Sequence, residues 1–148
     1  MRYDPSARPG TPPHITIMFP FLDPTRLTSQ TFADLDDLFA ATAPFEYALT
    51  EVREFEQGVL YLAPEPAQPF VDLTALVSQR FGILPFGGAY PTVIPHLTVT
   101  QLAPADERRR IGEALSRALP KSGRASEAWL MVGRNETSWK TVHVTRFR

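Results

Sequence analysis

The sequence predicts an α+β fold that is bilobal, with two pseudo-twofold-related antiparallel-sheet lobes, outer helices and a central groove. Three observations lead to this prediction. Segments with the period of a half-buried strand alternate along the chain with segments that have the period of an amphipathic helix. Both halves of the chain run strand, helix, strand, strand, with one additional helix in the first half, and each half carries the same Pro-His-apolar-Thr-apolar pattern, at residues 13–17 and 95–99. Such a repeat indicates two related structural units.

The first half of the chain is expected to contain an irregular arm followed by strand, helix, strand, strand and helix. These segments are expected at residues 1–12, 14–19, 28–44, 45–55, 58–62 and 69–82. The arm is rich in Pro and Gly, which favours irregular structure. The last helix is the most clearly delimited, because Pro69 stands at its start and Gly82 at its end, the positions that these residues prefer.

The second half is expected to contain a turn-rich loop, then strand, helix, strand and strand. These segments are expected at residues 85–95, 96–102, 104–120, 127–133 and 139–147. The helix is amphipathic, with Ile111, Leu115 and Leu119 on its inner face, and Pro120 closes it. Because no linker separates the halves, we expect residues 1–148 to form a single domain whose two lobes are intertwined.

Composition excludes several classes of protein. Hydrophobic residues make up 43% of the 148 residues and the net charge is −1, which argues against a disordered chain and a generally basic nucleic-acid binder. The absence of cysteine excludes disulfides, thiolate catalysis and Cys-ligated zinc. Apolar runs stay well short of the roughly 20 residues of a membrane span, and no signal peptide is recognisable at the N-terminus. We therefore expect a cytoplasmic protein, and a monomer.

The repeated pattern places histidine and threonine side by side. In a strand, residues i and i+2 point to the same face, so His14 shares a face with Thr16, and His96 shares one with Thr98 and Thr100. The apolar residues that alternate with them point to the opposite face and are expected in the core. They include Phe19, at the end of the first segment. If the lobes are related by a pseudo-twofold, the two His-Thr pairs face each other across the groove.

Two histidines and two threonines around one groove suit phosphoryl chemistry. Histidine titrates near pH 6.5, so one imidazole can act as general base while the other acts as general acid. Threonine hydroxyls can donate hydrogen bonds to phosphate oxygens. In-line displacement at phosphorus by such a group of residues requires no cofactor, and we expect none. The alternative is that His14 and His96 are ordinary histidines on the polar faces of two strands.

The third histidine complicates the assignment. His143 also lies in a His-x-Thr pattern, with Thr145, but it lacks the preceding proline. Three interpretations are open. His143 lines the groove beside the other two histidines, it is an ordinary exposed histidine of a strand, or it is itself one of the two paired histidines. The alternation of its strand places it on the same face as Trp139. Tyr90, in the loop that leads to the second motif, and Trp139 are candidates for stacking on a base, with plain packing as the alternative.

The segments "PPHITIMFPF" and "IPHLTVTQL" resemble the paired motifs of the 2H phosphoesterase superfamily, and specifically its 2'-5' RNA ligase-like, cyclic phosphodiesterase branch. The segment from Phe55 to Phe81 resembles the region between the motifs in that branch. The resemblance implies a bilobal α+β fold and chemistry on 2',3'-cyclic phosphates or 2'-5' linkages. It also implies that His14 and His96 form the acid/base pair and that Thr16 and Thr98 hold the phosphate.

These observations predict a metal-independent phosphoesterase that acts on RNA ends or nucleotides with a cyclic phosphate or a 2'-5' linkage. The reaction is hydrolysis of a 2',3'-cyclic phosphodiester, reversible 2'-5' RNA ligation, or both. One alternative is a non-catalytic module that binds a nucleotide or RNA in the same groove. Another is a zinc site formed by the three histidines.

Overall fold

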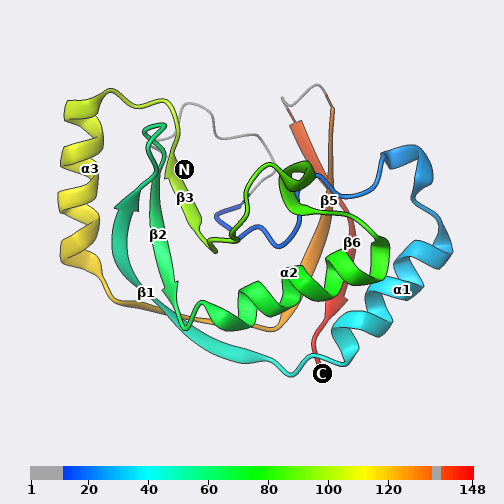
Figure 1. Cartoon of the computed structure of the whole chain (residues 1–148). Helices are drawn as coiled ribbons and strands as arrows, with labels where there is room; N and C mark the ends of the chain where they lie inside the picture. The colour runs from blue at the N-terminus through cyan, green and yellow to red at the C-terminus, as the bar shows by residue number, and fades with distance from the viewer. Residues whose placement is uncertain (1–11, 135–137) are drawn as a thin grey trace.

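The computed structural model describes residues 12–134 and 138–148, so most of the predicted N-terminal arm lies outside the described residues. Figure 1 shows two antiparallel sheets with helices around them. The elements follow one another as η1 (Pro24–Arg26), α1 (Ser29–Ala40), β1 (Phe45–Glu54), β2 (Leu60–Glu65), α2 (Gln68–Phe81), η2 (Pro85–Gly88), β3 (Leu97–Thr100), α3 (Ala105–Ala118), β4 (Lys121–Ala125), β5 (Glu127–Arg134) and β6 (Ser138–Arg146).

The predicted α+β class is confirmed, and the helices lie close to their predicted positions. Thr28 caps α1, because its hydroxyl accepts a hydrogen bond from the backbone N–H of Thr31. Gly82 ends α2 with a positive φ of 65°, a conformation that glycine adopts without steric cost. Strand β4 was not predicted, because its sequence, KSGRA, has little hydrophobic alternation.

The larger sheet combines both halves of the chain. Its strand order is β3-β2-β1-β4. Strands β1 and β2 precede the second His-x-Thr motif in the sequence, whereas β3 and β4 follow its histidine. Strands β5 and β6 form a second sheet of two strands. The predicted strand at 14–19 is reduced to a single bridge, between Ile15 and Leu97, because the backbone bends on both sides of it.

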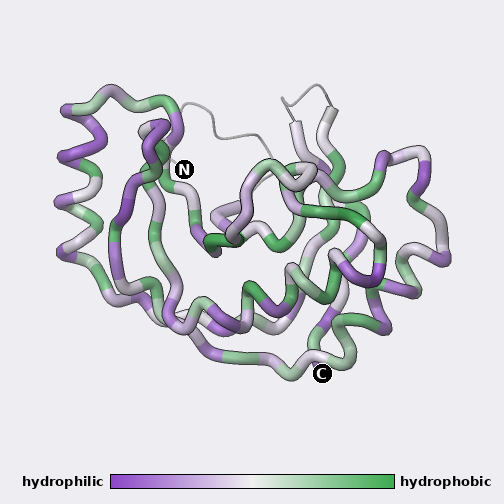
Figure 2. Tube along the Cα trace, in the orientation of Figure 1, coloured by the Kyte–Doolittle hydropathy of each residue, from purple (hydrophilic) through white to green (hydrophobic). Residues whose placement is uncertain are grey.

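Helix α3 covers one face of the four-stranded sheet. A Cβ atom placed on Gly112 of α3 would lie 3.6 Å from Val52 Cγ1 and 3.9 Å from Leu60 Cδ1, so helix and sheet are in close contact there. In Figure 1, α3 lies on the outer side of the curled sheet. Hydrophilic residues recur along α3 in Figure 2, as expected of a helix that contacts the sheet with one face only. The opposite face of the sheet is left for the functional site.

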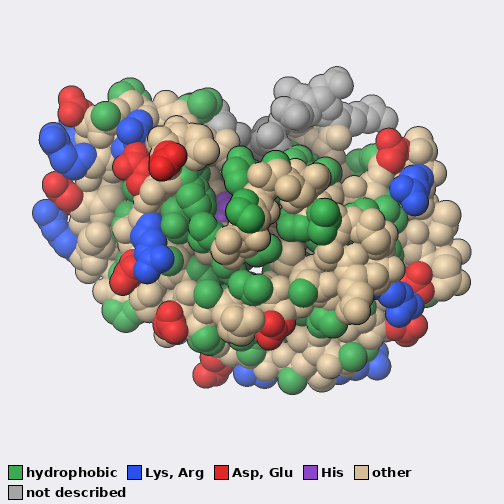
Figure 3. All heavy atoms as spheres, in the orientation of Figure 1, with side chains coloured by type: hydrophobic (Ala, Val, Ile, Leu, Met, Phe, Trp, Pro, Cys, Tyr) green, Lys and Arg blue, Asp and Glu red, His purple; other side chains and the backbone are tan. Residues whose placement is uncertain are grey.

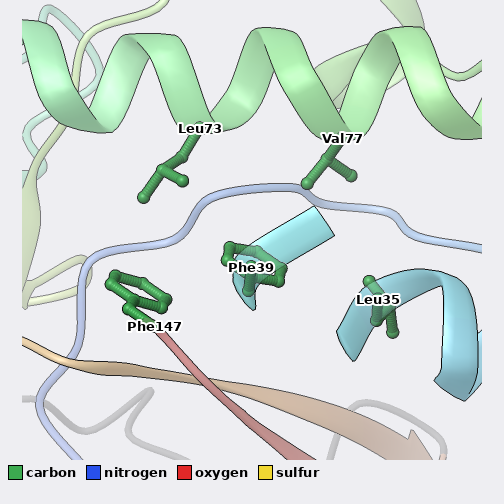
Figure 4. Packing of buried hydrophobic residues seen from close by; sticks show 5 residues of the cluster. All are labelled: Leu35, Phe39, Leu73, Val77 and Phe147. Carbon is green, nitrogen blue, oxygen red and sulfur yellow. The ribbon is translucent and has the colours of Figure 1, made fainter. Parts of the chain in front are cut away.

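The main hydrophobic cluster joins α1, α2 and the end of the chain. Figure 4 shows its five buried members, Leu35, Phe39, Leu73, Val77 and Phe147. The rings of Phe39 and Phe147 stack, with centroids 5.4 Å apart. Ile17 and Met18, which follow the first motif, pack against this cluster, and the Thr74 hydroxyl donates a 2.6 Å hydrogen bond to the Ile17 carbonyl. The first motif is thereby fastened to helix α2.

Bulges correct two predictions about which residues share a face. In β3, Thr98 pairs with Tyr61 and Thr100 pairs with Leu60, so Val99 is an extra residue. Thr100 therefore points to the α3 side, where it is completely buried, and not to the side of Thr98. In β6, Val142 is the extra residue, since His143 pairs with Leu130 and Thr141 with Met131. His143 and Trp139 consequently lie on opposite faces.

Candidate functional site

The single bridge between Ile15 and Leu97 brings the two predicted motifs together. The bridge is antiparallel, so the residues on either side of it face each other: His14 lies opposite Thr98, and Thr16 lies opposite His96. Directly opposed residues have Cβ atoms about 4.5–5.5 Å apart. Because side chains alternate along an extended chain, we infer from this register that all four side chains project from the face opposite to Ile15 and Leu97. The bridge brings the backbones of two segments that are far apart in the sequence side by side.

The two histidines are held by the same local contact. His14 Nδ1 lies 2.8 Å from the carbonyl oxygen of Pro12, and His96 Nδ1 lies 2.7 Å from the carbonyl oxygen of Ile94. A carbonyl oxygen can only accept a hydrogen bond, so Nδ1 carries the proton in both rings. When the ring is neutral, the other nitrogen, Nε2, is therefore unprotonated and can accept a proton.

The surroundings of the two histidines differ. His14 is exposed, whereas His96 is half-buried against a pair of aromatic rings. The ring of Phe55 lies 5.1 Å and the ring of Tyr61 lies 5.6 Å from the His96 ring, both in edge-to-face geometry. Phe55 and Tyr61 stack on each other at 4.2 Å. Sequence reasoning missed these two residues, because only the pairing of Tyr61 with Thr98 shows that they share the face of the histidines.

A cavity of about 140 Å³ lies beside His96 on the same face of the sheet. It is lined by Thr50, Glu51, Arg53, Tyr61, Ala63, Pro64, Glu65, Ala67, Ile94 and Pro95. Ile94 and Pro95 lead directly into His96, and the carbonyl of Ile94 anchors its ring. Figure 3 shows a histidine side chain in a hollow near the middle of one face, between hydrophobic side chains. A larger and shallower hollow of about 640 Å³, along β1 and β4, includes no histidine and is therefore not the candidate site.

Tyr90 and Trp139 belong to one aromatic cluster. Tyr90 contacts Phe86, with ring centroids 5.5 Å apart, and Phe86 contacts Phe19 at 6.1 Å. Phe19 also contacts Trp139 at 6.3 Å. The prediction that Phe19 lies in the core is wrong, because its side chain is 40% exposed. The cluster thus joins the segment after the first motif to the loop before the second.

His143 has different partners from the other two histidines. Its Nε2 lies 2.8 Å from Asp36 Oδ1 of helix α1, and its ring stacks on Phe32 at 4.8 Å with an interplanar angle of 9°. The hydrogen bond from His143 lowers the pKa of the Asp36 carboxyl, and Thr145 contributes in the same direction. In this position His143 joins β6 to α1, a contact that none of the three sequence-based interpretations included.

The described residues contain no group of three His, Asp or Glu side chains arranged to hold a metal ion. Since all three histidines are among the described residues, the three-histidine zinc site is not formed. Within the same residues, no helix is both long and apolar enough to cross a membrane.

Comparison with known families identifies the chain. The model of the 2'-5' RNA ligase superfamily matches residues 1–137. The chain belongs to this superfamily. The match extends over both His-x-Thr motifs and over β1 to β5 of the fold. Membership in the 2'-5' RNA ligase superfamily, whose members are 2H phosphoesterases, supports phosphoesterase or ligase activity on an RNA or nucleotide substrate.

A solved structure supports the fold. The crystal structure of E. coli LigT in its apo form is similar over 99% of this chain and 84% of that one, with a TM-score of 0.58 and 16% sequence identity. At this identity the likeness concerns the fold alone. Comparison with curated proteins gives no match.

Proposed function

We propose that this member of the 2'-5' RNA ligase superfamily is a metal-independent phosphoesterase. Its substrate is an RNA end or nucleotide with a 2',3'-cyclic phosphate, and reversible 2'-5' ligation is the related reaction at the same site. His14 and His96 act as the general acid and base, while Thr16 and Thr98 bind the phosphate. The observation that carries the proposal is the Ile15–Leu97 bridge, which sets each histidine opposite the threonine of the other motif.

The arrangement supplies each group that hydrolysis needs. One histidine, neutral and with Nε2 free to accept, takes a proton from the attacking water. The new P–O bond forms as the bond from phosphorus to one ribose oxygen breaks, and the other histidine, protonated on both nitrogens, gives its proton to that leaving oxygen. The two threonine hydroxyls donate hydrogen bonds to the non-bridging oxygens as negative charge builds up. In ligation, a ribose hydroxyl replaces water as the nucleophile.

The Nδ1 contacts support the same assignment. With Nδ1–H donating to a backbone carbonyl, each ring keeps one orientation and leaves Nε2 for proton transfer. Because both histidines have this contact, each can serve as acid or base, as hydrolysis and its reversal require.

The proposal is tested with 2',3'-cyclic nucleotides and cyclic-ended RNA, with and without EDTA. His14→Ala and His96→Ala should each lower kcat by roughly 10²–10⁴-fold, the contribution of general acid–base catalysis. Thr16→Val and Thr98→Val should cost about tenfold or more, as expected when a hydrogen bond to a charged group is lost. EDTA should leave the rate unchanged.

His143→Ala is the matched control, because it removes the histidine that contacts α1 and should retain activity. If it alone abolishes hydrolysis, the pairing of His14 with His96 is wrong. Loss of activity in EDTA would establish a metal-dependent reaction instead. Binding of nucleotides without turnover would identify the protein as a binding module.

A further inference from the structure

The cavity beside His96 contains charged side chains for which the proposed chemistry gives no role. Its position follows from the register of the sheet. Arg53 pairs with Tyr61, and Tyr61 pairs with Thr98, so these three residues form one row across β1, β2 and β3. Glu51 pairs with Ala63 in the neighbouring row. If the β2–β3 pairing continues by one residue beyond Leu62 and Leu97, Ala63 lies opposite His96. The row that holds Glu51 and Ala63 then reaches His96.

The small side chain of Ala63 leaves the space beside the imidazole open. Arg53 lies two strands from Thr98, a separation of roughly 10 Å at the strand spacing of a sheet. That distance is on the scale of a nucleotide, measured from its phosphate to the far edge of its base. A nucleotide with its phosphate between the two motifs could therefore place its base in the cavity.

The charges of the cavity argue against a second phosphate. Two carboxylates, Glu51 and Glu65, line it together with a single guanidinium, that of Arg53. Arg53 donates a hydrogen bond to the Glu51 carboxylate, and this hydrogen bond is the main cause of the raised pKa of the guanidinium. The net charge of the lining is therefore negative. It disfavours an anion and favours a neutral group that has more hydrogen-bond donors than acceptors.

Glu51 and Arg53 hold each other in place and keep hydrogen-bonding capacity for a ligand. Arg53 Nε and Nη2 lie 2.8 Å and 2.6 Å from the same oxygen, Glu51 Oε2. The other oxygen, Oε1, accepts no hydrogen bond within the described part of the chain. Both side chains are more than half exposed, at 55% and 57%, so a ligand can reach them. An exposed pair of this kind contributes little to stability and can adjust to a ligand at small cost.

We propose that Glu51 and Arg53 form a base-specificity pocket that prefers guanine. The inference rests on the proposed function, because the phosphate must lie between His14 and His96. Among the RNA bases, guanine alone carries two adjacent N–H donor positions, N1–H and N2–H₂, beside an acceptor, O6. The Glu51 carboxylate accepts from the two donors, and Arg53 donates to O6. Tyr61, Ala63, Ile94 and Pro95 provide the less polar walls.

The test compares the 2',3'-cyclic phosphates of guanosine, adenosine, cytidine and uridine. Wild-type protein should hydrolyse the guanosine compound with a kcat/KM about tenfold or more above the others, since a well-placed pair of hydrogen bonds to a base discriminates by about 1–3 kcal/mol. The inosine compound, which lacks only the N2 amino group, should have an intermediate value. Glu51→Ala and Arg53→Ala should each bring the guanosine-to-adenosine ratio close to one.

A second Glu–Arg pair in the same sheet provides matched controls. Glu46 of β1 and Arg124 of β4 approach to 3.9 Å, with both side chains exposed, and they line the hollow that includes no histidine. Glu46→Ala and Arg124→Ala should retain the preference for guanosine. The inference is overturned if the wild type treats all four compounds alike, if it prefers another base, or if the control variants lose the preference equally.

Binding measurements separate this inference from the proposed function. Calorimetry with the four 2'-nucleoside monophosphates should give the same order of affinities, and Glu51→Ala should abolish that order. A guanine preference in binding without any hydrolysis would retain the pocket and refute the proposed catalysis. Hydrolysis without base preference would retain the catalysis and refute the pocket. Absence of both hydrolysis and binding would refute both.

Discussion

At the scale of single residues, the proline in each motif has a physical explanation. A residue that precedes proline is confined to extended conformations, and proline itself has a fixed φ. In both motifs this restriction falls on the segment whose carbonyl, from Pro12 or Ile94, accepts the hydrogen bond of the histidine two residues later. The Pro-His pair therefore fixes the ring and its tautomer. His143 has no preceding proline, and its ring donates a hydrogen bond to the Asp36 carboxylate instead.

The pair of Asp36 and His143 predicts a pH dependence of stability. The pKa of Asp36 is lower in the folded protein than its ordinary value of about 3.9, mainly because His143 donates a hydrogen bond to it. The folded state therefore binds fewer protons than the unfolded state across this interval, and stability rises with pH there. The contribution of Asp36 should be complete above about pH 4 and should disappear as the pH falls through the folded pKa.

Thermal unfolding of Asp36→Asn between pH 2 and pH 7 measures this contribution. The variant should have a lower Tm than the wild type at pH 7 and should approach it in acid. Asp37→Asn removes a neighbouring carboxylate but not this hydrogen bond, and should leave the Tm at pH 7 nearly unchanged. A constant difference between Asp36→Asn and wild type over the whole range would contradict the assignment.

At the scale of secondary-structure elements, the apolar periodicity of the sequence predicts where the helices lie but not where the strands have bulges. The apolar spacing of α2 matches the buried Phe70, Leu73 and Val77, because packing of one face of a helix requires that spacing, but Leu76 lies outside the packed face. Because of the bulges at Val99 and Val142, Thr100 lies on the opposite face from Thr98, and Trp139 lies on the opposite face from His143. No local pattern in the sequence predicts such an extra residue. Strand β4 forms because β1 offers it a partner, which its own composition does not reveal.

Helix α2 provides the prediction at this scale. Leu73 is 2% exposed within the main cluster, whereas Leu76 of the same helix is 43% exposed. Leu73→Ala should lower the free energy of unfolding by about 2–5 kcal/mol, the usual cost of truncating a buried leucine. Leu76→Ala should change it by about 0.5 kcal/mol or less. Denaturant unfolding of both variants checks the difference, and equal losses would contradict the packing of α2 described above.

At the scale of the whole molecule, the pairing of the two motifs could be predicted and the cavity could not. The repeat of Pro-His-apolar-Thr-apolar indicates two related segments, and the bridge from Ile15 to Leu97 is where they meet. Phe55, Tyr61, Glu51 and Arg53 reach the same face through the register of β1, β2 and β3, which depends on long-range pairing. The separation of Tyr90 and Trp139 from His143 likewise depends on tertiary packing.

The central claim is that His14 and His96 act as one catalytic unit, and a double-mutant cycle tests it most directly. The single-turnover rate of 2',3'-cyclic phosphate hydrolysis is measured for His14→Ala, His96→Ala and the double variant. Residues that act together are strongly non-additive, so the double variant should be about as slow as either single one. If the two losses multiply in the double variant, or if one of the single variants retains the wild-type rate, the two histidines do not form the site described above.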